Sequence, residues 1–221
     1  MRAINPNLKE RMHIPLNGLL ITLEGIDGSG KSTLANALHN AITKKNIPVL
    51  LTREPGGSDL GKKLRTMLQD RSVSLCPKAE FLLFAADRAQ HIHDVIIPNL
   101  QKGGLVISDR MADSSLVYQG FGRGLDLQFI EMVNIWAMNG IKPALTIYLK
   151  ISPEQARERL ASRSPQLTAF EKDVDGLRQR LVHGFETIFA QRDNVLTLDA
   201  TLSVEELTAQ AVNVILPLLK Y

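Results

Sequence analysis

The chain has 221 residues, of which 44% are hydrophobic and 22% are charged, and its formal net charge is only +3. This composition is ordinary for a globular protein, the length suits one α/β domain, and so small a charge demands no nucleic acid partner. No apolar run approaches the roughly 18 residues of a membrane span. The single cysteine, Cys76, excludes an intramolecular disulfide, so we expect a cytoplasmic protein in which Cys76 is a small buried residue.

Residues 1–17 are polar, contain Pro6 and Pro15, and lack the apolar core of a signal peptide. We expect a flexible N-terminal extension here, followed by one domain over residues 18–221. That domain opens with residues 19–24, an apolar run typical of a strand buried on both faces of a parallel sheet.

The next residues, 25–32, read Gly-Ile-Asp-Gly-Ser-Gly-Lys-Ser and match the phosphate-binding pattern G-x-x-x-x-G-K-[ST]. Apolar residues at helical spacing follow over 33–42, so the motif has the strand before it and the helix after it that it requires. Glycines let backbone N–H groups point at phosphate oxygens, and Lys31 can reach the β- and γ-phosphates. The predicted ATP-binding residues are Gly25, Ile26, Asp27, Gly28, Ser29, Gly30, Lys31, Ser32 and Thr33.

Strands and helices alternate along the rest of the chain. Further strands are expected over 47–52, 105–109, 145–149 and 195–199, and helices over 60–70, 77–100, 126–139, from 153, over 170–191 and after 203. Residues 110–124 are expected to be part helix and part loop. The alternation predicts a doubly wound α/β sheet of about five parallel strands, the P-loop kinase fold.

The strand over 105–109 ends in a carboxylate, as a Walker-B strand does, so Asp109 and the Ser32 hydroxyl are the predicted Mg²⁺ ligands. Arg53 and Arg110 each follow an apolar strand at the sheet edge where the phosphate-binding loop begins. Arginine suits a bidentate grip on phosphate, so a second phosphorylated ligand should face the ATP. The base-reading sequence N-K-x-D of G proteins is absent from the chain, which favours a nucleotide kinase.

The chain resembles bacterial thymidylate kinases over essentially its whole length beyond residue 17. The resemblance rests on four segments in the right order: Glu24–Thr33, Thr52–Gly57, Leu83–His91 and Asp109–Gly120. It implies ATP-dependent phosphorylation of dTMP to dTDP with Mg²⁺, a step of dTTP biosynthesis, by a homodimer packed through helices. A kinase for another small acceptor, and a P-loop protein that binds nucleotide without turnover, stay open as alternatives.

The resemblance also implies roles for individual residues. Arg53 and Arg110 would hold the phosphate of dTMP, Phe84 would stack on thymine, Arg88 would donate to its O4, and Tyr118 would pack under the sugar. Neighbouring substrate-binding positions are Ser114, Ser115 and Gln119. Asp27 would touch the sugar 3′-hydroxyl or the phosphate–Mg²⁺ cluster, and the implied catalytic residues are Lys31, Arg110, Arg163, Arg159 and Asp27.

Some members of this family carry a catalytic arginine inside the phosphate-binding loop, whereas others supply it from a lid. The loop position is Gly28 here, so the chain resembles the lid-dependent type, with the lid over about 160–170. Arg163 is the first candidate for the catalytic arginine and Arg159 the second. The chain departs from the family pattern in the lid, and also at Met111 and Ala144.

Overall fold

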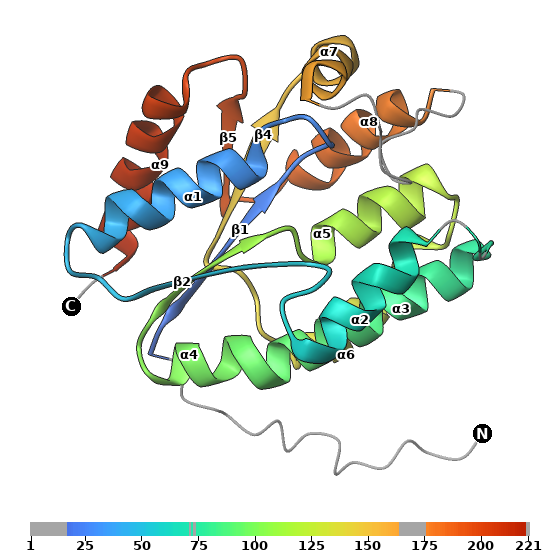
Figure 1. Ribbon diagram of the computed structural model, residues 1–221, viewed down its shortest axis with the longest axis horizontal. Coiled ribbons are helices and arrows are strands. Elements are labelled where there is room, and N and C mark those ends of the chain that lie inside the picture. The colour runs from blue at the N-terminus through green and yellow to red at the C-terminus, as the bar shows by residue number, and fades with distance from the viewer. Residues whose placement is uncertain (1–16, 71, 73, 164–175, 220–221) are drawn as a thin grey trace.

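The computed structural model describes residues 17–70, 72, 74–163 and 176–219. Its centre is a five-stranded sheet in which every pair of neighbours is parallel and the strand order is β2-β3-β1-β4-β5 (Figure 1). The prediction of a parallel sheet of about five strands is therefore confirmed. The strands are β1 (Leu19–Glu24), β2 (Val49–Arg53), β3 (Leu105–Asp109), β4 (Leu145–Lys150) and β5 (Val195–Asp199).

Helices cover both faces of the sheet, with α1 and α9 side by side on one of them (Figure 1). The helical segments are α1 (Lys31–Thr43), α2 (Asp59–Gln69), α3 (Pro77–His91), the π-helical η2 (Ile92–Ile96), α4 (Ile97–Gln101), α5 (Ala112–Ser115), the π-helical η3 (Leu116–Gly122), α6 (Leu127–Ala137), α7 (Pro153–Arg163), α8 (Leu177–Phe189) and α9 (Val204–Leu218). No helix among the described residues is both long and apolar enough to cross a membrane.

The core explains why the strands are apolar runs rather than alternating patterns. Ile21, Leu23 and Ile107 are buried against α1 and α9, whereas Leu20 and Val106 are buried on the opposite face against η2 and α4. Burying one such side chain contributes about 1.5–3 kcal/mol, so the sheet is a rigid base for the loops at its carboxyl edge. The connection after β1 leads to β2, whereas the connection after its neighbour β3 leads in the opposite direction, past β1 to β4. Doubly wound folds bind ligands at the carboxyl ends of strands where the connections part in this way.

Within 110–124, expected to be part helix and part loop, residues 112–122 are helical as α5 and η3, and the flanking residues are not. Two other local expectations differ from the structure. The helix expected over 77–100 contains a π-helical turn, where the Ile97 N–H bonds to the Ile92 carbonyl; Pro98 has no N–H to continue the regular ladder. Cys76 is exposed rather than buried, because it precedes Pro77 at the solvent-facing start of α3. Most of the predicted lid, and residues 1–16 of the predicted extension, lie outside the described residues.

Candidate active site

The loop between β1 and α1 owes its shape to its glycines. Gly25, Gly28 and Gly30 have φ of 143°, 89° and 97°, in the region that residues with a side chain rarely adopt. A Cβ on Gly28 would lie 2.5 Å from the carbonyl oxygen of Ala156 in α7. Residues with a side chain would therefore strain the backbone at these three positions. The loop leads directly into the N-terminus of α1, and backbone N–H groups at a helix N-terminus bind anions.

Lys31 begins α1, and its side chain is buried inside the loop. Its Nζ donates to the carbonyl oxygens of Gly25 (3.0 Å) and Ile26 (2.8 Å) and to the Ser29 hydroxyl (3.3 Å). Burial and, after it, the charge of Arg110 together lower the pKa of Lys31 to about 8. A bound polyphosphate would offer this ammonium group full negative charge in place of carbonyl dipoles, so the residue is prepared for an anionic ligand.

Ser32 and Asp109 meet beside the loop. The Ser32 hydroxyl donates to Oδ2 of Asp109 at 2.5 Å, so the structure brings together the two predicted Mg²⁺ ligands, one from the start of α1 and one from the end of β3. Oxygen donors are the ligands that Mg²⁺ prefers. Within the described residues no cluster of three or more His, Cys, Asp or Glu side chains can hold a metal, so phosphate and water oxygens would have to complete the coordination.

Arg110, directly after β3, has a φ of 72°, and such unfavourable backbone conformations concentrate at functional sites. Its guanidinium donates to the Gly25 carbonyl (2.9 Å), to Asp27 (2.6 Å) and to the Tyr118 hydroxyl (3.1 Å). The Tyr118 hydroxyl in turn donates to Asp27 (3.0 Å). Burial alone would raise the pKa of Asp27, but the charges of Arg110 and Lys31 outweigh it and hold the pKa below its usual value.

Glu24, the last residue of β1, ties the segment after β3 to the phosphate-binding loop. Its two carboxylate oxygens accept from the Met111 N–H (2.9 Å) and from the Ser114 hydroxyl (2.6 Å), and Ser114 also accepts from Arg110 (3.1 Å). Burial and, after it, the nearby charge of Asp113 together raise the pKa of Glu24 to about 8. This carboxyl group is thus a structural part of the site.

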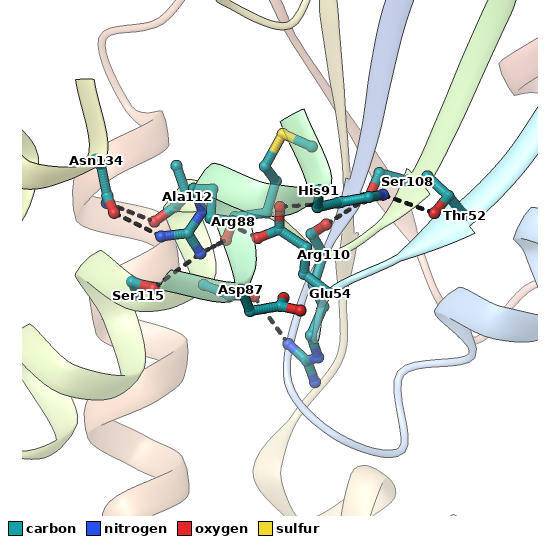
Figure 2. Close-up of polar contacts among 12 residues, drawn as sticks. Thr52, Glu54, Asp87, Arg88, His91, Ser108, Arg110, Ala112, Ser115 and Asn134 are labelled. Carbon is teal, nitrogen blue, oxygen red and sulfur yellow. Dashed lines mark hydrogen bonds and ion pairs between the residues drawn. The ribbon is translucent and has the colours of Figure 1, made fainter. Parts of the chain in front are cut away.

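A second group of side chains surrounds Arg88 of α3 (Figure 2). Its Nε donates to Glu54 (2.9 Å), its Nη1 to Asn134 (2.6 Å), and its Nη2 to the Ser115 hydroxyl (3.0 Å) and to the Met111 carbonyl (3.2 Å). The other oxygen of Glu54 lies 3.1 Å from Nδ1 of His91. Arg88, Glu54 and His91 are all buried.

Other predicted acceptor-site residues lie near this group. Phe84 is half-buried and precedes Arg88 by four residues, so the two side chains share one face of α3. Gln119 is buried and donates to Glu80 (2.9 Å), which also pairs with Arg123 at 3.3 Å. The structure thus gathers the residues expected at the base around α3 and η3.

A family model for thymidylate kinase matches residues 23–211 of the chain. The chain belongs to the thymidylate kinase family. It is 42% identical over 194 residues to the thymidylate kinase of Halothermothrix orenii, which covers 87% of this chain and 93% of that one. It is 44% identical over 170 residues to that of Carboxydothermus hydrogenoformans, with 77% and 83% covered, and 40% identical over 201 residues to that of Leifsonia xyli, with 90% and 96% covered.

The sequence of this thymidylate kinase predicts three further site arginines, and they lie in different places. Arg53 is exposed at the end of β2 and pairs in register with Asp109 of β3. Arg159 of α7 donates to the Ala200 carbonyl (2.7 Å) and lines a cavity of about 320 Å³ together with Gly28, Gly30, Thr33 and Leu202. Arg163 is the last residue of α7, and its side chain lies outside the described part of the chain.

Sequence reasoning missed three residues of the site. Glu54 lies inside the motif Thr52–Gly57, but no pattern shows that its carboxylate reaches α3. Arg65 of α2 donates to the Pro55 carbonyl (2.9 Å), and besides burial the charge of Arg53 lowers its pKa, so it lies close to the predicted phosphate site. Asn134 had a visible signal, because it is a lone amide on the buried face of α6 that also carries Ile130 and Ala137.

Proposed function

We propose how this thymidylate kinase binds its two nucleotides and transfers the phosphoryl group between them. The reaction itself, phosphorylation of dTMP to dTDP, follows from the family. The observation that carries the proposal is the position of Arg110, which extends from the end of β3 and bonds to Gly25 and Asp27 of the phosphate-binding loop. An arginine at this junction can contact the acceptor phosphate while it lies beside the donor phosphates.

For the acceptor, we assign the phosphate of dTMP to Arg53 and Arg110 and the sugar to Tyr118, which Arg110 covers at 4.9 Å from the ring centre. The base would stack on Phe84, and Arg88 would donate to its O4. A donor at this point favours the keto group of thymine over the amino group of cytosine, because two donors cannot bond to each other. The remaining assigned residues around the acceptor are Ser114, Ser115 and Gln119.

For the donor, we assign the triphosphate of ATP to residues 25–33 and the adenine to the cavity lined by Arg159, whose guanidinium can stack on a planar base. Mg²⁺ would bind to Ser32 and Asp109, and when bound it supplies positive charge to the phosphate oxygens. Because residue 28 is glycine, we further propose that the transition-state arginine comes from a lid over about 160–170, with Arg163 the first candidate.

Transfer of a phosphoryl group needs alignment and charge neutralisation more than covalent help. Lys31 and Arg110 would neutralise the charge that develops between the two nucleotides, and Asp27 would keep Arg110 oriented through its hydrogen bond. The attacking group is a phosphate oxygen of dTMP that is already anionic, so no general base is required. Closure of the lid would exclude water and limit wasteful hydrolysis of ATP.

We also infer that residues 18–221 form one kinase domain, that the protein is cytoplasmic, and that it is a homodimer packed through α3 and α6. The support is a group of large apolar side chains that α3 and α6 leave exposed, with Trp136 80% exposed. The two helices contact each other, and the exposed apolar residues that they carry are Leu82, Leu127, Phe129, Met132, Ile135 and Trp136.

The test is ADP release, measured with ATP, Mg²⁺ and one nucleoside monophosphate at a time. We expect strong release with dTMP, weaker release with dUMP, and little with dCMP or dGMP. A higher kcat/KM for dCMP or dGMP would overturn the assignment of the base to Phe84 and Arg88. Release that no monophosphate stimulates would overturn the proposed acceptor site as a whole.

A further inference from the structure

The guanidinium of Arg88 is held by three different parts of the chain. Glu54 follows β2, Asn134 lies on α6, and Met111 and Ser115 belong to the segment after β3 (Figure 2). The side chains of Arg88, Asn134 and Ser115 are 1%, 3% and 2% exposed. Such a buried cation keeps one orientation only while these partners stay in place.

A guanidinium carries five N–H groups, and their use can be followed atom by atom. Nε donates to Glu54, both hydrogens of Nη2 have acceptors in Met111 and Ser115, and Nη1 donates to Asn134. The second hydrogen of Nη1 bonds to none of the described residues. Because the hydrogens of a planar guanidinium diverge at fixed angles, the bond to Asn134, made by the same nitrogen, helps to fix where this remaining hydrogen points.

Asn134 is itself fixed in one orientation. Its Nδ2 donates to the Ala112 carbonyl at 3.1 Å, and this directs its Oδ1 toward Arg88, where the 2.6 Å hydrogen bond forms. The amide therefore connects the backbone of α5 to the guanidinium of α3. Oδ1 and Nδ2 cannot exchange places, since a flipped amide would set its NH₂ group against the N–H of Arg88 and its oxygen against the Ala112 carbonyl.

We propose that Asn134 is a positioning residue that aims the remaining N–H of Arg88 at the acceptor base, and so contributes to selection of a 4-keto over a 4-amino pyrimidine. The inference rests on the proposed contact between Arg88 and the base. Without the acceptor on Asn134, the guanidinium as a whole relaxes toward its remaining partners Glu54, Met111 and Ser115, and the hydrogen bond to O4 lengthens. Binding of dTMP then weakens, whereas dCMP, which offers a donor there, gains or stays unchanged.

The test uses three variants on α6. Asn134→Leu keeps the branched shape of the side chain and removes both hydrogen bonds. Asn134→Asp keeps an acceptor for Arg88, adds a negative charge, and replaces the donor to the Ala112 carbonyl by an acceptor. Ile130→Val, a buried change on the same face of α6, is the matched control for packing. We measure KM and kcat for dTMP, and the inhibition constant of dCMP against dTMP, on folded protein checked by circular dichroism.

For Asn134→Leu we expect the ratio of the dCMP inhibition constant to the dTMP KM to fall about tenfold, while kcat changes less than about threefold. Asn134→Asp and Ile130→Val should keep the ratio within about threefold of the original. If Asn134→Leu does not fold, Asn134→Ser, whose side chain is too short to reach Arg88, replaces it with the same expected fall.

An unchanged ratio in the folded Leu or Ser variant overturns the proposal. An equal fall in the Leu and Asp variants also overturns it, since the bond to Ala112 would then be the one that matters. Arg88→Lys separates these results from failure of the underlying assignment. If that variant also leaves the ratio unchanged, Arg88 does not read the base; if it lowers the ratio while Asn134→Leu does not, only the role of Asn134 is wrong.

Discussion

Glu54 is the residue whose loss the structure makes easiest to quantify. Glu54→Gln keeps the shape of the side chain but removes the charge that both Arg88 and His91 contact. Breaking a buried ion pair by removing one partner costs about 3–5 kcal/mol. Arg88 retains its bonds to Asn134, Ser115 and Met111, so we expect about 3 kcal/mol, the low end of that range. In a chain of this size that loss lowers Tm by roughly 6–12 °C.

The assay is thermal unfolding followed by circular dichroism. The matched control is Asp59→Asn, which breaks an ion pair with Lys62 whose side chains are 95% and 70% exposed. Solvent screens such a pair, so we expect no measurable change in Tm for the control. A fall of less than about 2 °C for Glu54→Gln would refute the reasoning, because it would mean that the buried pair contributes no more than an exposed one.

Three further predictions concern the phosphate-binding loop and Glu24, the residue before it. Lys31→Ala should lower kcat for dTMP at least about 100-fold with an unchanged circular dichroism spectrum, and near-normal turnover would contradict its role. Gly28→Ala should raise the KM for ATP about tenfold, because its Cβ meets the Ala156 carbonyl, whereas Gly124→Ala, with open space around its Cβ, should not. Glu24 takes up a proton on folding between pH 4.5 and about 8, so its contribution to stability falls as pH rises through that window. Urea midpoints at pH 5 and 8 should therefore differ less in Glu24→Gln than in the original chain; an equal difference would contradict the raised pKa.

Local patterns were enough to predict the sheet and the phosphate-binding loop. Residues 19–24 form an uninterrupted apolar run because the strand is buried on both faces, and the glycine spacing of residues 25–32 reflects the positive φ angles that the loop needs. Both signals lie within a few consecutive residues. Tertiary packing did not have to be known for either of them.

The contacts around Arg88 could not be predicted in the same way. Glu54 and Asn134 lie 34 and 46 positions away along the chain, and only the folded arrangement of β2, α3 and α6 brings them together. The π-helical turn before Pro98 had a local cause, the missing N–H, but periodicity alone shows only that the segment is helical. The roles assigned to the individual site residues all stay predictions.

Arg110 belongs to both halves of the site at once, because the guanidinium assigned to the acceptor phosphate also bonds to the Gly25 carbonyl and to Asp27 of the donor loop. A nucleotide that shifts Arg110 from either side therefore changes the hydrogen bonds that face the other nucleotide, so the two binding steps should be coupled. By thermodynamic reciprocity, the factor by which dTMP changes the affinity for ATP must equal the factor by which ATP changes the affinity for dTMP.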